Sequence, residues 1–255
     1  MIFEIGLENA MYELKICHLY PDILNLYGDR GNIICMQKRM EWRGIKAEVT
    51  GISVGDALNY DDYDIFFIGG GQDFEQGVLL KDLADGKAKA IRAAVEEEKV
   101  FLAICGGYQM LGSYYKTWDG KQCDFIGALD LYTVGHKDRM IGNYMYQCSE
   151  EDGGIVVVGF ENHSGKTYLG DKVRPMGKVL SGNGNNGEDG TEGARYKNVF
   201  ATYSHGSLLP KNPKLADYIL KTALKRKYPN INLEELDDTF ENNAHDYMEH
   251  RLSAK

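Results

Sequence analysis

Cys105 lies where an apolar run meets two glycines. The run Val100–Ile104 predicts a buried parallel strand. Cys105 follows at once, then Gly106 and Gly107, and a helix-like stretch begins at Tyr108. Glycine beside a nucleophile permits a strained backbone and close approach of a substrate, and a helix N-terminus favours a thiolate. The segment therefore predicts a nucleophile elbow centred on Cys105. The alternative is a buried structural cysteine at the end of a strand.

A cysteine nucleophile needs a base, and histidine most often serves as one. His205 comes shortly after the strand-like run Val199–Tyr203. The carboxyl ends of strands in an open α/β sheet are where ligands bind, so His205 is well placed for this role. From the sequence alone, His136 and His163 are rival candidates.

Two further glycine-containing segments carry weaker signals. Gly69–Gly71 follows the strand-like run Asp64–Ile68 and predicts either a tight turn or a second backbone amide for an oxyanion hole. The run from Gly159 to Thr167 resembles a phosphate-binding loop. Five residues separate Gly159 from Gly165, however, whereas that loop needs four. We therefore do not expect a nucleotide site there.

Apolar runs alternate with amphipathic stretches along the chain, which predicts an α/β fold with a largely parallel sheet and helices on both faces. Strands are expected at Leu14–Tyr20, Ala47–Ser53, Asp64–Ile68, Val100–Ile104, Ile155–Phe160 and Val199–Tyr203. Helices are expected around Ile33–Met40, over Lys87–Glu98, directly after Cys105 and from Asn212–Pro213 onward.

The composition excludes several classes of protein. The chain has 255 residues, 43% hydrophobic residues and a net charge of −9, so it can bury a core but shows no basic surface for nucleic acid. No apolar run is long enough to span a bilayer, and the first residues do not look like a secretory signal. Five scattered cysteines without a CxxC pair predict free thiols in a reducing cytoplasm and no metal site.

We expect one domain over residues 1–255, because neither a linker nor a repeat interrupts the sequence. The segment 181–193 holds five glycines and predicts a flexible loop, with a mobile flap or a partner contact as the alternative. The acidic tail from about residue 233 to 252 predicts a surface helix, with Leu236, Phe240 and Tyr247 roughly on one side.

Taken together, these segments resemble the class I glutamine amidotransferases of the cobyric-acid-synthase-like branch. Within that branch they are most similar to the GatD-type glutaminase subunits of lipid II isoglutaminyl synthase. The resemblance rests on HLYPDILNLYGDRGN (18–32), FIGGGQDFEQ (67–76), AICGGYQMLG (103–112), GFENHSGKTYLG (159–170), GNGNNGEDGTEGARYKNVF (182–200) and YSHGSLLPKNP (203–213).

The resemblance implies a role for each candidate residue. Cys105 would attack the side-chain amide of L-glutamine, and His205 would act as general acid and base. The amides of Gly71 and Gly106 would form the oxyanion hole. Arg139 would hold the carboxylate of glutamine through its planar fork; without the resemblance it would be interpreted as a surface arginine.

One position departs from the broader class. Ordinary class I enzymes place a glutamate two residues after the histidine, and this chain has Ser207 there. The cobyric-acid-like branch commonly lacks that acid. The group that orients His205 therefore stays open at this point.

The resemblance also implies a partner. A glutaminase alone makes ammonia and cannot activate a carboxylate. A MurT-like synthetase subunit of the Mur ligase family, using ATP and Mg²⁺, would therefore amidate the D-glutamate of lipid II. This chain itself would need no cofactor, and the heterodimer would work in the cytoplasm, meeting the membrane only through the partner or the lipid substrate. Two alternatives remain: a cobyric-acid-synthase-like amidotransferase with another acceptor, and a non-catalytic subunit that kept the fold.

Overall fold

The computed structural model describes residues 11–71 and 76–254. Five of the predicted strands and one further strand, β11, form a six-stranded sheet in the order β11-β12-β4-β3-β1-β2, in which only the edge strand β11 runs antiparallel. The bounds are β1 (Glu13–Leu19), β2 (Lys46–Ile52), β3 (Ile65–Ile68), β4 (Val100–Ile104), β11 (Ala194–Tyr196) and β12 (Val199–Thr202). The continuous apolar runs of β3 and β4 are fully buried, as strands covered on both faces must be.

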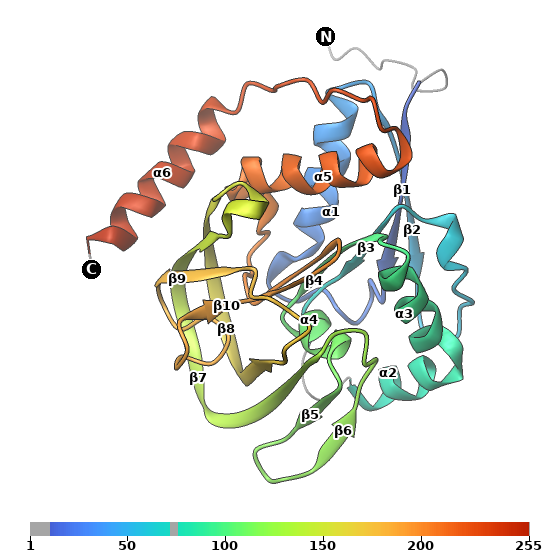
Figure 1. The fold of residues 1–255 in the computed structure, drawn as a ribbon, viewed down its shortest axis with the longest axis vertical. Coiled ribbons are helices and arrows are strands. Elements are labelled where there is room, and N and C mark those ends of the chain that lie inside the picture. Colours follow the sequence, from blue (N-terminus) through green and yellow to red (C-terminus); the bar gives the residue numbers. More distant parts are fainter. Residues whose placement is uncertain (1–10, 72–75, 255) are drawn as a thin grey trace.

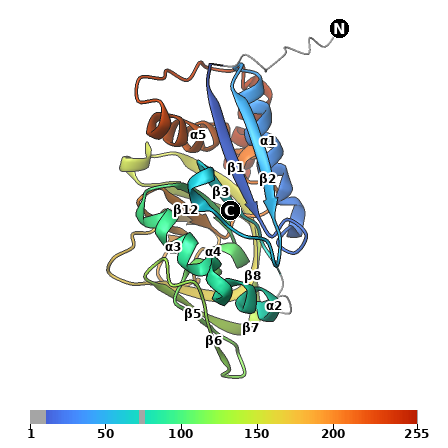
Figure 2. The ribbon, with the colours of Figure 1, turned by 90° about the vertical axis from the view of Figure 1, so that its right-hand side faces the viewer.

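Helices lie on both faces of this sheet, as predicted. The connections from β1 to β2 and from β3 to β4 step in opposite directions across the sheet, so right-handed crossovers put α1 and α3 on opposite faces. Figure 2 shows these two helices on either side of the strands. The helices are α1 (Arg30–Glu41), α2 (Gln76–Asp82), α3 (Ala88–Glu96), α4 (Gly106–Leu111), α5 (Pro213–Lys227) and α6 (Thr239–Ser253).

A second, mainly antiparallel sheet was not expected from the sequence. It has the order β10-β9-β7-β5-β6, with β8 paired to β7, and lies beside the first sheet (Figure 1). Its strands are β5 (Tyr114–Lys116), β6 (Gln122–Asp124), β7 (Leu131–Cys148), β8 (Val156–Leu169), β9 (Gly177–Ser181) and β10 (Thr191–Glu192).

The predicted strand Ile155–Phe160 is therefore only the first part of β8. The strand continues through Glu161, Asn162 and His163, which are polar yet buried, and this is why the apolar pattern ended too early. The GKT tripeptide lies inside the same strand rather than between a strand and a helix. This placement agrees with the rejection of a phosphate-binding loop.

The glycine-rich segment 181–193 is packed against the fold through polar side chains. We expected a flexible loop here, and the structure instead buries Asn185, Asn186 and Glu192. The Asn185 side chain accepts from the amide of Gly193 at 2.8 Å and donates to its carbonyl at 3.0 Å. The carboxylate of Glu161 accepts from the amide of Gly184 at 3.0 Å. The glycines allow the tight turns of this segment, and the hydrogen bonds of the buried side chains hold it in one conformation.

The acidic tail forms a helix, but a shorter one than expected. Helix α6 begins at Thr239 rather than near residue 233, and the carboxylate of Asp238, directly before it, accepts from Arg39 of α1. Phe240 is 87% exposed and Tyr247 65% exposed, as a surface helix allows. Leu252 anchors the far end of the helix in a small apolar cluster with Met145 and Val158.

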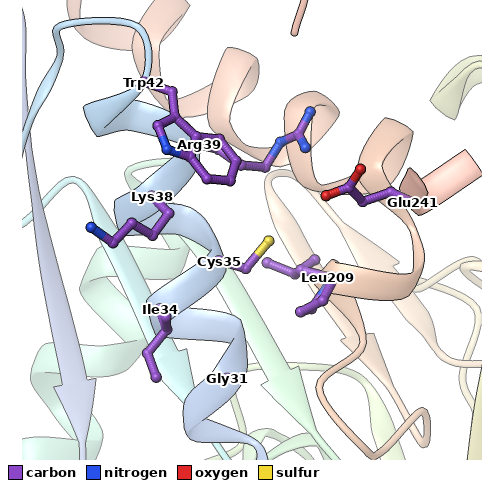
Figure 3. A pocket seen from close by; sticks show the side chains of 9 residues that line it. Gly31, Ile34, Cys35, Lys38, Arg39, Trp42, Leu209 and Glu241 are labelled. Carbon is purple, nitrogen blue, oxygen red and sulfur yellow. The ribbon is translucent and has the colours of Figure 1, made fainter. Parts of the chain in front are cut away.

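Arg39 links helix α1 to helix α5 and to the residue directly before helix α6. Its buried guanidinium donates to Asp217 at 2.7 Å and, as a fork, to both oxygens of Asp238 at 2.6 and 2.8 Å. Figure 3 shows Arg39 and Cys35 pointing from α1 toward Glu241 and Leu209. Within residues 11–71 and 76–254, none of the helices combines the length and apolarity needed to cross a membrane.

Replacing Arg39 by alanine should destabilise the fold, because two carboxylates would lose a buried cation. We expect the free energy of unfolding, measured with urea, to fall by about 3 kcal/mol. Lys38→Ala is the matched control on the same helix. Lys38 makes only an exposed pair with Glu41, so its loss should cost less than about 1 kcal/mol. Equal effects of the two substitutions would contradict this account.

Candidate active site

Cys105 adopts the strained turn that the sequence predicted. It has φ 47° and ψ −102°, a conformation that side chains other than glycine rarely adopt. Its N–H donates to the carbonyl of Thr202 on β12 at 2.8 Å, and its carbonyl accepts from the amide of Gln109 at 2.9 Å, which starts α4. Strain of this kind persists only where the surroundings hold it, and it concentrates at functional sites.

The two glycines after Cys105 are needed for close packing. A Cβ on Gly107 would lie 2.6 Å from the carbonyl oxygen of Ile68, and one on Gly106 would lie 3.0 Å from the amide nitrogen of Gly71. The chain therefore brings Gly71 and Gly106, the two residues predicted to supply oxyanion-hole amides, into direct contact beside Cys105.

His205 is fully buried and lies next to Cys105. Its backbone N–H donates to the carbonyl of Phe160 on β8 at 2.8 Å, so the second sheet fixes the position of the histidine. Cys105 is close enough for its charge to raise the pKa of the imidazole. Nδ1 of the imidazole lies 3.4 Å from Oδ1 of Asp29. Three side chains from distant parts of the sequence thus come together.

Asp29 is the group next to His205 that the sequence alone did not identify. It precedes α1, at a position where an aspartate usually caps the helix, yet its side chain makes no capping hydrogen bond. Instead, the buried carboxylate accepts from the amide of Gly70 at 2.8 Å and faces His205. The sequence offered only an ordinary helix-cap signal, so nothing in it distinguished Asp29 from a structural residue.

Gly70 makes the approach of Asp29 to His205 possible. A Cβ at this position would lie 2.5 Å from Cε1 of His205 and 3.1 Å from Oδ2 of Asp29. The glycine run after β3 therefore has two uses. Gly70 leaves room for the imidazole and binds the carboxylate, while Gly71 meets Gly106.

Ser207 does not replace the glutamate that other class I enzymes carry. Its hydroxyl donates to the carbonyl of Gly28 at 2.7 Å, away from the imidazole. The carboxylate that faces the histidine therefore comes from the residue before α1, and not from the segment after β12 that carries His205.

The charge state of His205 follows from its neighbours. Burial alone lowers the pKa of the imidazole. The charge of Cys105, the hydrogen bond with Asp29 and the charge of Asp29 outweigh burial and raise the pKa of His205 to about 10. The imidazole therefore holds its proton at neutral pH, which is the state that a general acid needs.

Arg139 lies on β7 at an irregularity between Gly135 and Met140. Its Nε donates to the side-chain oxygen of Asn162 at 2.9 Å, and its Nη2 donates to the carbonyl of the same residue at 3.3 Å. Asn162 is two residues from Phe160, whose carbonyl holds His205. The guanidinium is exposed, so a charged substrate can reach it.

The rival histidines have other surroundings. His136 is exposed on β7. His163 is buried, its ring stacks on Tyr203 with centroids 3.5 Å apart, and its Nδ1 lies 2.7 Å from the carbonyl oxygen of Gly165. These contacts make His163 a packing residue beneath the site.

A buried carboxylate supports the end of β12. One oxygen of Glu192 accepts from the Thr202 hydroxyl and from the amide of Tyr203, both at 2.7 Å. Burial raises the pKa of Glu192 to about 7 against the opposing effect of these bonds. Sequence reasoning missed Glu192, because its glycine-rich surroundings suggested a loop.

All five cysteines, Cys105 included, are free thiols. Burial raises the pKa of Cys17, Cys35 and Cys148, which makes them poor nucleophiles at neutral pH. No group of three or more possible metal ligands occurs in the part of the chain that the structure describes.

The pKa of His205 can be tested by an NMR titration of its ring. Cys105→Ala removes the charge that raises the pKa of His205 most, so the pKa should fall by at least about one unit. Cys123→Ala, which changes a thiol outside the site, should leave the titration unchanged. A His205 pKa that is the same in the Cys105→Ala protein would show that the two side chains are not coupled.

Comparison with known proteins places this geometry in a family. The family model described as the CobB/CobQ-like glutamine amidotransferase domain matches residues 15–213. The lipid II isoglutaminyl synthase (glutamine-hydrolyzing) subunit GatD of Streptococcus pneumoniae is 43% identical over 86% of this chain and 84% of its own length. The protein of the same name from Staphylococcus aureus is 43% identical over 91% of this chain and 93% of its own length.

The fold has a counterpart among solved structures. A glutamine amidotransferase from Thermotoga maritima superposes with a TM-score of 0.55 and 16% identity, covering 94% of this chain and 95% of that one. This likeness shows the shared fold, while the family model and the relatives define membership. The chain belongs to the CobB/CobQ-like glutamine amidotransferase family.

Proposed function

We propose that this chain is the glutaminase subunit of a lipid II isoglutaminyl synthase. It hydrolyses L-glutamine and delivers the ammonia to a synthetase subunit. The observation that carries the proposal is that Cys105, His205 and Asp29 come together at the strained turn after β4. The similarity to GatD subunits over most of their length supports it and favours a cell-wall acceptor over a corrinoid.

In the first half-reaction, the Cys105 thiolate adds to the side-chain carbonyl carbon of glutamine and forms a C–S bond. The negative charge on the carbonyl oxygen is met by the backbone amides of Gly71 and Gly106. The His205 imidazolium gives its proton to the amide nitrogen, the C–N bond breaks, and ammonia leaves. A γ-glutamyl thioester remains on Cys105.

In the second half-reaction, His205 is neutral and accepts a proton from water as the water oxygen attacks the thioester. The C–S bond breaks, glutamate leaves, and Cys105 returns to the thiolate form. Asp29 holds the imidazole in the orientation that both steps need. The guanidinium of Arg139, which Asn162 positions, binds the α-carboxylate of glutamine.

The acceptor reaction needs a partner. We assign it to a MurT-like synthetase of the Mur ligase family, which binds ATP and Mg²⁺ and activates the α-carboxyl of D-glutamate in the lipid II stem peptide. Ammonium is not a nucleophile, so ammonia has to pass between the subunits along a protected route. The resulting heterodimer acts in the cytoplasm, at the membrane face that presents lipid II.

The direct test is glutamate release from glutamine by the purified chain, with and without the synthetase. Cys105→Ala should lower the rate by at least about 10³-fold, because the nucleophile is lost. Cys123→Ala should retain the wild-type rate. Retained activity in Cys105→Ala would refute the proposal. No release by the folded wild-type chain, even with the synthetase, would indicate a non-catalytic subunit.

The acceptor is tested in the same mixture by adding ATP and either lipid II or a corrinoid carboxylate. Amidation of lipid II that requires an intact Cys105 is the expected result. Preferential amidation of the corrinoid would favour the cobyric-acid-synthase-like alternative.

Asp29→Asn should lower kcat by about 10²-fold or more while changing KM little, because the imidazole loses its orienting charge and the substrate contacts remain. Asp85→Asn is the matched control, since Asp85 is exposed and makes no described contact with the site. A loss that appears in KM alone would assign Asp29 to substrate binding instead.

A further inference from the structure

A polar pocket of about 450 Å³ lies away from Cys105, at the carboxyl ends of β1 and β2 and beside the first turn of α1. Its volume suits a small metabolite. Five of its lining residues have polar side chains: His18, Asp22, Asn25, Arg30 and Gln37. We call it the Arg30 pocket.

His18 lines this pocket and has a buried ring nitrogen that lacks a hydrogen-bond partner among the described residues. It is only 5% exposed. The ring packs edge-on against Phe67 at 5.2 Å. Burial, and next the charge of Arg30, lower the pKa of His18 to about 4, so the ring is neutral at pH 7. A neutral imidazole offers one donor and one acceptor, and buried polar atoms normally find a partner.

Two more side chains in this pocket are uncommitted. The guanidinium of Arg30 makes no hydrogen bond or ion pair within residues 11–71 and 76–254; only its backbone amide does, to Asn25 at 2.9 Å. The side-chain amide of Gln37 likewise has no partner within that part of the chain. Asp22, by contrast, already accepts from the hydroxyl of Ser53 at 2.8 Å.

This set of groups selects a type of ligand. A free guanidinium presents a planar fork that matches a carboxylate or a phosphate. The neutral imidazole and the amide suit uncharged polar atoms on the same molecule. Asp22 disfavours a second negative charge near it, so a molecule with one anionic group at the Arg30 end fits best.

We propose that the Arg30 pocket binds a small molecule with a carboxylate or phosphate group, held by Arg30, whose neutral polar part bonds His18 and Gln37. This inference concerns a second site on the chain and does not rest on the glutaminase function.

The test is an NMR titration of the full chain with inorganic phosphate and, separately, with succinamate, which carries one carboxylate and one neutral amide. Sodium chloride at equal ionic strength and neutral succinamide are the controls. We expect saturable shifts of the His18 ring with at least one of the two anions, at a dissociation constant near or below about 1 mM, and none with the controls. The anion that binds more tightly distinguishes a phosphate ligand from a carboxylate ligand.

Three variants locate the binding. Arg30→Gln should weaken it by at least about tenfold, as should His18→Phe, which keeps an aromatic ring against Phe67. Lys38→Gln removes the same charge from the same helix at a residue that lines a different pocket (Figure 3), and it should bind like wild type. Arg30 is exposed, so its variant should fold even where the His18 variant does not.

Two results would overturn the proposal. One is the absence of saturable shifts with both anions up to about 10 mM. The other is equal affinity in the Arg30→Gln and Lys38→Gln proteins, since binding would then reflect general charge on the helix rather than this pocket.

Discussion

The strained turn at Cys105 is the constraint on which the rest of the site depends. A cysteine with positive φ is unfavourable on its own, and it persists here because β12 accepts its N–H and α4 begins at its carbonyl. The amide of Gly107 also donates to the carbonyl of Gly69 at 3.1 Å, which fixes the loop after β3 against the elbow. One local distortion therefore holds three strand ends in a common geometry.

Beneath these strand ends lies a polar core rather than an apolar one. Tyr203 accepts from the side-chain amide of Gln109 at 3.0 Å, lies 2.6 Å from the hydroxyl of Thr167, and stacks on His163. Glu192 holds the backbone of the same tyrosine from the other side. These contacts hold the ring and the backbone of Tyr203 in place. Tyr203 comes two residues before His205, the proposed general acid and base.

The second sheet is what distinguishes this molecule from a plain doubly wound fold. Its long strand β8 supplies the carbonyl that binds His205, the asparagine that positions Arg139, and the carboxylate that orders the glycine-rich segment. Three consecutive residues of β8, Phe160, Glu161 and Asn162, thus contact three parts of the proposed site and its surroundings. The hydrogen bonds of Arg39 with Asp217 and Asp238 lie in another part of the molecule, where they link the C-terminal helices to α1.

The sequence by itself determined the parallel strands and the elbow, because buried parallel strands are continuous apolar runs and because a nucleophile between a strand and two glycines is a local pattern. It did not determine the second sheet, since β8 buries Glu161, Asn162 and His163 through hydrogen bonds that no apolar periodicity reveals. Nor could it select Asp29 over other loop acids. That carboxylate lies 176 positions away from His205 along the chain. Only the packing of the loop before α1 against Gly70 decides that the two meet, and such a contact depends on tertiary structure rather than on any spacing in the sequence.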